Sequence, residues 1–471
     1  MSVSKQILKN MFSLTAAELA GKGLAFVFTI YLLRTIGPEN NGILTQAKSI
    51  VGVLFVLVWL GFEQVGIREV SRDRSKMLYF VGTILSIRMI IALICYAVLI
   101  IGLELFGDFA RISVTTRIVA YIYGLLLFGN AIILNWVFQA IEKMHIIAIR
   151  SVMLNLLNLA GILIFVHNEN DLILAVWIIT ISMLINSAWM LIYYIRNYGL
   201  PKLNFNYKSW GELLGQSSRV GFVFLIVTLY NNVGYHFLNY FHGAVETGIY
   251  GAAVQIVLFL TIPSAILQGA FFPQIAKLST VIERNNMVSR YVMMNILAGV
   301  AMSFSLLVFS DVVVSVLGKK YSQTEDIIKY LSLVVLIQYV STSFTCPLIA
   351  WNKEKTVIYA NVSGLVAVII FSIALIPSYG YIGASIALVA CESAVMIVLA
   401  FIYYRLQSTI YLNVMLKLLG VGILAFSIGF LLINSGLNIY LSFIITISLY
   451  IVLNFMFKIL QINELLAIVK R

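Results

Sequence analysis

Long apolar stretches alternate with short polar ones along the whole chain. Each apolar stretch is about 20 residues long, which is the length that an α-helix needs to cross a hydrocarbon core of roughly 30 Å. Stretches such as "MIIALICYAVLIIG" (89–102) have no period of two, so the pattern is not that of a membrane β-barrel. The sequence therefore predicts an all-α polytopic membrane protein. Fourteen transmembrane helices are expected, at residues 12–34, 42–62, 78–103, 115–139, 146–166, 172–195, 217–240, 248–271, 291–316, 327–351, 356–377, 381–404, 412–433 and 439–458.

The composition agrees with this class. Hydrophobic residues make up 61% of the chain, charged residues only 11%, and the mean hydropathy is +1.00, all far from the usage of soluble domains. The three cysteines (Cys95, Cys346 and Cys391) fall inside predicted spans, where they do not form the spacing of a secreted disulfide framework or of a metal site. We interpret them as packing residues.

The basic residues predict the orientation of the chain. If both termini are cytoplasmic, 22 of the 31 Lys and Arg residues fall on the inner connections and only 6 on the outer ones. Such a bias orients membrane proteins among anionic lipids, and it accounts for most of the net charge of +12 without a nucleic-acid partner. The connections are too short for a soluble domain, so the function is expected to reside in the membrane.

Two stretches of the chain resemble each other at an offset of 206 residues. "GPENNGILTQA" (37–47) and "GAVETGIYGAA" (243–253) align two pairs of glycines, and at an offset of 210 "QAIEKMH" (139–145) lies over "IAWNKEK" (349–355). Either Gly-x4-Gly recurs by chance among 31 glycines, or the chain is a duplication of about six helices with a site between the copies. Duplication predicts an N-terminal lobe at 1–198, a cytoplasmic linker at 199–216, a C-terminal lobe at 217–405, and two further helices with a cytoplasmic tail at 406–471.

Several segments resemble the polysaccharide flippases (O-antigen, Wzx-type) of the multidrug/oligosaccharidyl-lipid/polysaccharide (MOP, MATE-like) superfamily. They are "YLLRTIGPENNGILTQAKSI" (31–50), "LGFEQVGIREVSR" (60–72) and "LGKKYSQTEDIIKYLSL" (317–333). The resemblance implies two pseudo-symmetric six-helix lobes around a central cavity, plus a C-terminal pair of helices.

The same resemblance implies a function. Such a protein is not an enzyme but moves a polyprenyl-pyrophosphate-linked oligosaccharide across the bacterial inner membrane by alternating access. The expected partners are this substrate and membrane lipids, with transient contact to a polysaccharide polymerase and glycosyltransferases.

Charged residues inside predicted spans mark the candidate path, because an ionisable side chain in hydrocarbon is costly and normally faces water or a partner. Lys22, Lys48, Arg88 and Arg34 are the candidate ligands of the pyrophosphate, and Glu18 stands four residues before Lys22 as its charge partner. In the alternative interpretation, Glu18 and Lys22 only neutralise each other and the arginines extend to the interface.

The second half offers polar and aromatic residues instead. Asn231, Asn232 and His236, flanked by tyrosines, and Gln255 are candidates to bind a hydroxyl-rich sugar. They could equally form an interfacial aromatic belt or bonds between helices.

Three further residues are candidates for a mechanical or coupling role. Pro263 and Pro347 are predicted to kink their spans, and Glu392 is a candidate for coupling to H⁺ or Na⁺. No cofactor and no metal site are expected. The rival functions are a cation-coupled multidrug exporter of the same superfamily, and a membrane polysaccharide polymerase, which would need a large outer loop that this chain lacks.

Overall fold

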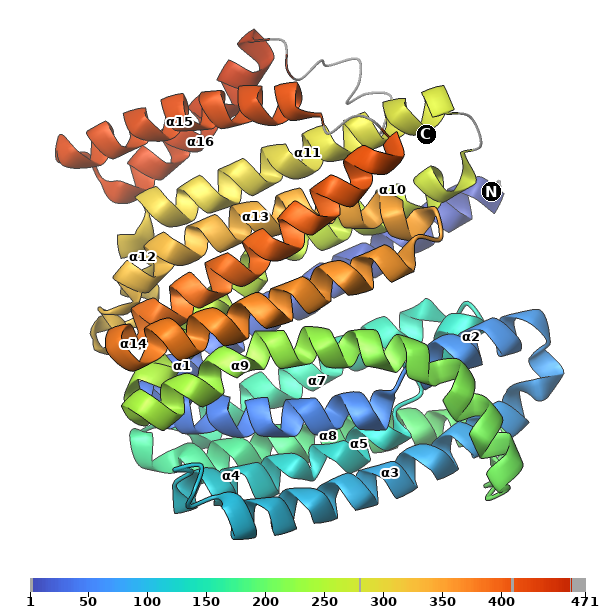
Figure 1. Cartoon of the computed structure of the whole chain (residues 1–471). Helices are drawn as coiled ribbons and strands as arrows, with labels where there is room; N and C mark the ends of the chain where they lie inside the picture. Colours follow the sequence, from blue (N-terminus) through green and yellow to red (C-terminus); the bar gives the residue numbers. More distant parts are fainter. Residues whose placement is uncertain (1–2, 279–280, 408–410, 458, 460–471) are drawn as a thin grey trace. The chain divides into compact units, whose positions relative to one another are not determined.

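The computed structural model describes residues 3–278, 281–407, 411–457 and 459, with side chains from residue 20 onward except those of residues 219, 281 and 282. Within these residues every regular element is a helix (Figure 1). The chain divides into two compact units, unit 1 (Met1–Gly248) and unit 2 (Ile249–Arg471). The boundary falls inside one long helix, α9 (Tyr207–Leu260). The lobe boundaries expected from the repeat stay a prediction.

Unit 1 holds eight further α-helices and two short 3-10 helices. They are α1 (Val3–Trp59), α2 (Phe62–Arg72), η1 (Arg74–Lys76), α3 (Met77–Phe106), α4 (Val114–Gly124), α5 (Leu126–Ile132), α6 (Asn135–Ala140), α7 (Met144–Phe165), η2 (Glu169–Asp171) and α8 (Leu172–Tyr198). Helix α1 packs on α4 and α7, α3 on α5, and α7 on α8, around cores that include Ile36, Val51, Trp136 and Val176.

Unit 2 contains the rest of α9 and the remaining helices. They are α10 (Ile262–Lys277), α11 (Val281–Val308), α12 (Ser310–Leu317), η3 (Lys319–Tyr321), α13 (Thr324–Ala350), α14 (Glu354–Gln407), α15 (Leu412–Asn434) and α16 (Ile439–Met456). Helix α13 packs against α11 and α14, and α15 packs against α11 and α16. The core of unit 2 includes Ile275, Tyr291, Val300 and Phe426.

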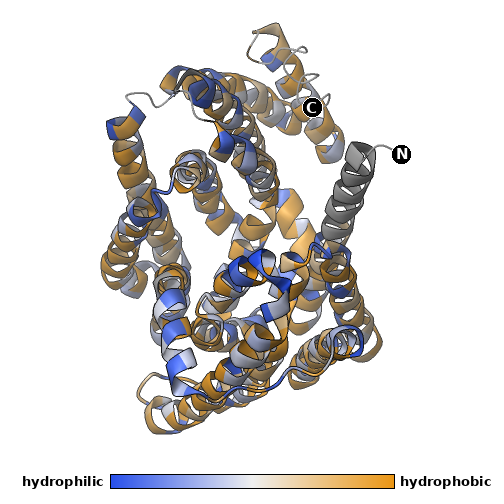
Figure 2. Ribbon diagram, turned by 90° about the vertical axis from the view of Figure 1, so that its right-hand side faces the viewer, coloured by the Kyte–Doolittle hydropathy of each residue, from blue (hydrophilic) through white to orange (hydrophobic). Residues whose placement is uncertain are grey.

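Eleven helical segments of the described residues are long and apolar enough to cross a membrane. Hydrophobic residues predominate along these helices (Figure 2), so the chain is a multi-pass, all-helical membrane protein. Three of the eleven segments, Ala20–Arg72, Val220–Lys277 and Glu354–Gln407, exceed 50 residues. At a rise of about 1.5 Å per residue, each is roughly twice as long as one crossing requires.

Each of the three long segments is interrupted at a glycine with positive φ, at Gly37, Gly243 or Gly380. The first two have nearly the same backbone conformation, with φ 75° and ψ 175° at Gly37 and φ 82° and ψ −170° at Gly243. An L-residue with a side chain rarely adopts this region. The two turns that align at an offset of 206 therefore share the same backbone geometry.

The second aligned pair of segments also repeats in three dimensions. Glu142 (φ 61°) and Asn352 (φ 58°) both adopt the left-handed conformation. In each loop the next residue, a lysine, donates its backbone N–H five residues back, at 2.8 Å from Lys143 to Phe138 and at 2.9 Å from Lys353 to Leu348. The two loops thus have equivalent turns at an offset of 210.

The aligned glycines Gly42 and Gly248 lie where α1 and α9 cross within unit 1. A Cβ atom on Gly42 would lie 1.8 Å from the carbonyl oxygen of Ala244, and one on Gly248 would lie 1.8 Å from that of Pro38. The side chain of Asn41 donates to the carbonyl oxygen of Gly248 at 2.7 Å. Two backbones can approach this closely only where both helices present glycine, which is the usual way helices associate in lipid.

Candidate functional site

Arg88 lies at the centre of a polar cluster inside unit 1. Its side chain is fully buried, and its guanidinium lies 3.4 Å from the carboxylate of Glu63, the first-turn acidic residue of α2. It also donates to the backbone oxygen of Asn130 at 2.7 Å and to the side-chain oxygen of Asn130 at 2.9 Å. A buried guanidinium requires this kind of compensation, because charge is costly away from water.

A second arginine belongs to the same cluster. Arg150, near the start of α7, donates to the side-chain oxygen of Asn186 at 2.9 Å, and the Asn186 amide donates back to the carbonyl oxygen of Arg150 at 2.9 Å. Arg150 also interacts electrostatically with Glu63. We call Glu63, Arg88, Asn130, Arg150 and Asn186 the arginine cluster. The arginine cluster contains two guanidinium groups and one carboxylate, so it carries a net positive charge.

The arginine cluster is also incompletely hydrogen-bonded. The Nε atoms of Arg88 and Arg150 are both buried, and neither has a hydrogen-bond partner among the described residues. Buried donors without acceptors cost free energy, and they favour the approach of an anion or of water. The arrangement is therefore suited to compensating negative charge.

Lys48 lies on α1 beside a hydrogen-bonded contact with α9. Gln46 and Ser49 hold His236, at 3.2 Å from the Gln46 amide nitrogen to Nδ1 and 2.9 Å from the Ser49 hydroxyl to Nε2. With this amide orientation Nδ1 accepts, so Nε2 carries the proton and donates to Ser49. His236, a predicted sugar ligand, thus joins the first repeat to the second inside unit 1.

The side chain of Lys48 has a different environment. Gln46 and Ser49 are three residues apart and share one face of α1, while Lys48 lies at least 100° around the helix from either. Lys48 is half-buried, and within the described residues it forms no hydrogen bond or ion pair. Its role as a ligand of the pyrophosphate stays a prediction.

The other candidates of the first span are less well defined. Lys22 is half-buried and Arg34 is exposed. The side chain of Glu18, the predicted partner of Lys22, lies outside the described residues. The roles of these three residues stay predictions.

Asn231 and Asn232 bond within their own helix. Their side-chain amides donate to the carbonyl oxygens four residues earlier, at 2.8 Å to Val227 and 2.7 Å to Thr228. Asn231 is exposed and Asn232 half-buried, so their side-chain oxygens stay candidates for a sugar hydroxyl. Gln255 is half-buried in the part of α9 that belongs to unit 2.

Glu392 lies inside unit 2 with an uncharged partner. It is 4% exposed, and its carboxylate accepts a hydrogen bond from the Gln338 amide of α13 at 3.0 Å. Nearby on α13, the Tyr339 carbonyl and the Ser343 hydroxyl accept from the Asn295 amide at 2.6 Å and 3.0 Å. Inside unit 2 the buried acid Glu392 thus bonds to an amide, and a second amide, that of Asn295, bonds to a carbonyl and a hydroxyl group of α13.

The two prolines have different environments. Pro263 lies in the first turn of α10, just after α9 ends at Leu260, so the helix is interrupted near this proline as predicted. At the start of a helix, however, proline removes no hydrogen bond from a helix interior. Pro347 lies inside α13 near its end, and its carbonyl oxygen accepts the N–H of Trp351. Pro347 is the one placed to weaken an existing helix.

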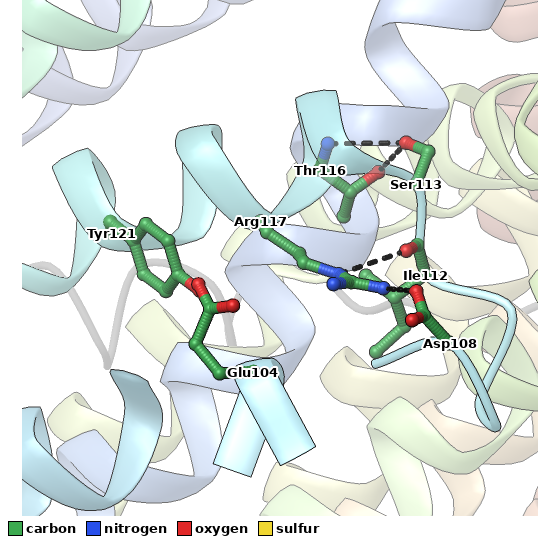
Figure 3. Close-up of polar contacts among 7 residues, drawn as sticks. All are labelled: Glu104, Asp108, Ile112, Ser113, Thr116, Arg117 and Tyr121. Carbon is green, nitrogen blue, oxygen red and sulfur yellow. Dashed lines mark hydrogen bonds and ion pairs between the residues drawn. The ribbon is translucent and has the colours of Figure 1, made fainter. Parts of the chain in front are cut away.

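Charged residues near the two ends of α3 form ion pairs and hydrogen bonds with the neighbouring loops and with α4 (Figure 3). Arg117 forms an ion pair with Asp108 and donates to the carbonyl of Ile112 at 3.2 Å, while the Tyr121 hydroxyl donates to Glu104 at 2.6 Å. At the other end of α3, the hydroxyl and N–H groups of Ser75 donate to Asp73, which lowers the pKa of that carboxyl. These groups are satisfied locally, so we interpret them as structural.

Sequence reasoning identified Arg88 and Glu392 but missed the rest of the arginine cluster. Arg150 and Glu63 lie near helix ends, where charged residues are common, so neither is conspicuous in the sequence. Asn186 gave a usable signal, because an amide in the middle of an apolar span is costly unless it is bonded. The described residues contain no group of three His, Cys, Asp or Glu side chains that could hold a metal ion.

The fold is that of the transporters of the MOP superfamily. The structure of the lipid II flippase MurJ in its inward closed conformation has a TM-score of 0.77 at 12% identity, covering 95% of this chain and 98% of MurJ. The inward-facing conformation of a multidrug resistance MATE family transporter gives 0.63 at 14% identity, covering 84% of this chain and 95% of the transporter.

The family follows from the sequence. Residues 7–279 match the family described as "Polysaccharide biosynthesis protein", so the chain belongs to that family. A curated relative, the putative O-antigen transporter of Shigella dysenteriae, is 24% identical over 392 residues, covering 82% of this chain and 96% of the relative. These findings confirm the resemblance on which the sequence-based prediction rested.

Proposed function

We propose that this protein is a flippase that moves a polyprenyl-pyrophosphate-linked oligosaccharide, such as an O-antigen repeat unit, across the bacterial cytoplasmic membrane. The observation that carries the proposal is the net positive arginine cluster inside a member of the polysaccharide biosynthesis family. A pyrophosphate that leaves headgroup water needs compensating cations and hydrogen-bond donors, and a drug cation does not. The relatives named above as flippase and transporter act by translocation and not by catalysis.

In the proposed topology the chain crosses the membrane fourteen times, with both termini in the cytoplasm. The support is that each of the three longest segments exceeds twice the length of one crossing and turns at a glycine. Two pseudo-symmetric six-helix lobes, 1–198 and 217–405, would then alternate access to a central cationic cavity. The last two helices follow as an additional pair.

Within this scheme Lys48 and Lys22 engage the pyrophosphate, with Arg88 and Arg34 adding positive charge. Asn231, Asn232 and Gln255 bind the sugar. Lys48 has the strongest support, because it is half-buried and forms no bond within the described residues. Glu392 couples transport to H⁺ or Na⁺, supported by its burial beside the neutral Gln338.

The second candidate function is a cation-coupled multidrug exporter. The observation that favours it is the buried carboxylate of Glu392 in a fold shared with a multidrug transporter. A buried carboxylate is the kind of group that a cationic drug would require. The arginine cluster of unit 1, with two arginines and one glutamate, argues for the flippase.

Deletion of the gene separates these functions. The flippase proposal predicts loss of surface polysaccharide and accumulation of the lipid-linked repeat unit, both restored by the wild-type gene. Raised sensitivity to cationic drugs with normal surface polysaccharide would instead establish the exporter. If the deletion strain keeps normal levels of the lipid-linked repeat unit but its surface polysaccharide has an altered chain length, the protein would be a polymerase.

A further inference from the structure

Unit 2 contains a polar cavity that the proposed transport function does not use. Its volume is about 280 Å³, and its polar lining consists of Arg284, Trp351, Asn352, Lys353 and Gln407. Three of these residues belong to the loop between α13 and α14, the second copy of the repeated turn. The remaining lining residues are small or aliphatic, so the polar groups determine what the cavity can bind.

The cavity lies at the level where the membrane-spanning segments end. Arg284 is the second residue of the segment Glu283–Val308, Gln407 is the last residue of Glu354–Gln407, and Lys353 directly precedes that segment. Segment ends of this kind lie at the boundary between hydrocarbon and lipid headgroups. The occupant of the cavity is therefore expected to come from the headgroup region or from the adjacent water.

The lining is cationic and rich in donors. It contains one guanidinium, one ammonium and two amide side chains, and no carboxylate. Glu283 and Glu354, the acids next to Arg284 and Lys353 in the sequence, do not line it. This donor set matches the oxygens of a phosphate group, which is an acceptor with up to four oxygens.

Arg284 is held in place by its neighbours. Its Nε donates to the backbone oxygen of Leu278 at 2.8 Å, and its guanidinium carbon lies 5.8 Å from the centre of the Trp351 ring. Trp351 in turn stacks on Tyr403, with ring centres 6.1 Å apart and planes 23° apart. The terminal nitrogens of a guanidinium fixed in this way are pre-organised to bind an anion.

Trp351 supplies a further donor. Its indole Nε1 is buried, and no acceptor for it exists among the described residues. An indole N–H that is buried without a partner is costly, so a bound acceptor would stabilise it. This second observation, independent of the charges, also indicates a ligand with acceptor oxygens.

The first copy of the repeated turn lacks this arrangement. There the ammonium of Lys143, the counterpart of Lys353, lies 5.3 Å from the centre of the Tyr198 ring, where a cation–π contact holds it. Lys143 and Lys353 therefore have the same backbone turn and different environments. Lys143 is a matched control for any experiment on Lys353.

We propose that the cavity formed by Arg284, Trp351 and Lys353 binds the phosphate group of an anionic membrane phospholipid. The lipid would bind at the surface of unit 2 and not along the transport path. The proposal does not depend on the transported substrate, since it rests only on the cavity and on its level in the membrane. Soluble phosphate offers the same acceptor oxygens, and the experiment separates the two sources.

The test measures lipid retained by the purified full-length protein. Native mass spectrometry would compare phosphatidylglycerol, phosphatidylcholine and inorganic phosphate as probes, with wild type, Arg284→Gln, Lys353→Gln and the control Lys143→Gln. We expect phosphatidylglycerol to bind about fivefold more weakly to each of the first two variants, and unchanged to Lys143→Gln. Trp351→Phe, which keeps the ring stack but removes the indole N–H, should also weaken binding.

Each outcome has a defined meaning. Equal retention of phosphatidylglycerol by wild type, Arg284→Gln and Lys353→Gln would overturn the proposal. If inorganic phosphate displaces the lipid and shows the same dependence on the variants, phosphate recognition stands and the soluble ion is the ligand. Should Arg284→Gln fail to fold, the exposed Lys353 decides the question.

Discussion

The polar interiors of the two units differ in charge although their turns repeat. In unit 1, the arginine cluster combines Arg88 and Arg150 with the single carboxylate of Glu63, which leaves a net positive charge among amides. In unit 2, Glu392 accepts from the neutral Gln338 and forms no ion pair among the described residues, which leaves a negative charge when the acid is ionised.

This contrast shows what a duplicated scaffold can conserve and what it can change. The turns at Gly37 and Gly243 keep one backbone geometry, with a positive φ at each glycine. The turn does not constrain the side chains in the interior, so the interiors of the two units can differ in charge. We infer that unit 1 is adapted to the anionic part of the substrate and unit 2 to a coupling cation.

The largest effect is expected when the arginine cluster loses Arg88. Arg88→Ala leaves Glu63 and the oxygens of Asn130 without their donor, which should lower the free energy of unfolding by about 3 to 5 kcal/mol. Thermal unfolding of the purified protein measures this change. The double variant Arg88→Met with Glu63→Leu removes the pair together, and it should recover much of the stability but not the surface polysaccharide. Recovery of both would show that the pair is only structural.

Replacement of Lys48 should affect transport strongly and stability little. Lys48→Ala removes a cation that has no bond within the described residues, so stability should change by less than about 0.5 kcal/mol. Transport of the lipid-linked repeat unit should fall about tenfold or more, because the pyrophosphate loses a charge-assisted bond. Flipping measured in vesicles at matched protein levels tests this, with Lys143→Gln as the control. Normal transport by the Lys48 variant would remove it from the site.

A third change tests whether the net positive charge of the arginine cluster matters for binding. Asn186→Glu brings a second carboxylate next to Arg150 and neutralises the arginine cluster. The protein should remain folded, since the new acid has a cation as its partner, while the affinity for a pyrophosphate should fall several-fold. Binding of a pyrophosphate-bearing lipid measures the loss. Asn186→Gln, which keeps an amide, is the matched control, and equal loss in both variants would contradict an electrostatic role.

A small effect on stability is also expected for the buried acid of unit 2. Glu392→Gln can still accept a hydrogen bond from Gln338, so the free energy of unfolding should change by about 1 kcal/mol. Transport should no longer respond to an imposed H⁺ or Na⁺ gradient, while movement down the substrate gradient continues. Vesicles with and without each gradient test this. An unchanged response to both gradients would exclude Glu392 as the coupling residue.

Much of the fold could be predicted because its cause is local. A span is recognised by its own composition, and the aligned glycines Gly37 and Gly243 mark turns that the structure contains. Of the arginine cluster, Arg88 was predicted because it lies deep in an apolar span, where a charge is anomalous. Arg150 and Glu63 lie near helix ends, where charges are common, and only their contacts in the folded protein show that Glu63 pairs with Arg88 and Arg150 with Asn186.

The sequence by itself determined that the chain is helical and that it crosses the membrane many times, and it predicted two related halves. These properties follow from hydropathy and from glycine spacing, which act over a few turns of the chain. Tertiary structure decided which polar groups meet. Residues as distant as Gln46 and His236 become partners only when α1 and α9 cross at Gly42 and Gly248. The likeness of "GPENNG" (37–42) and "GAVETG" (243–248) thus predicted the two turns. The packing of α1 on α9 decided which side chains meet beside them.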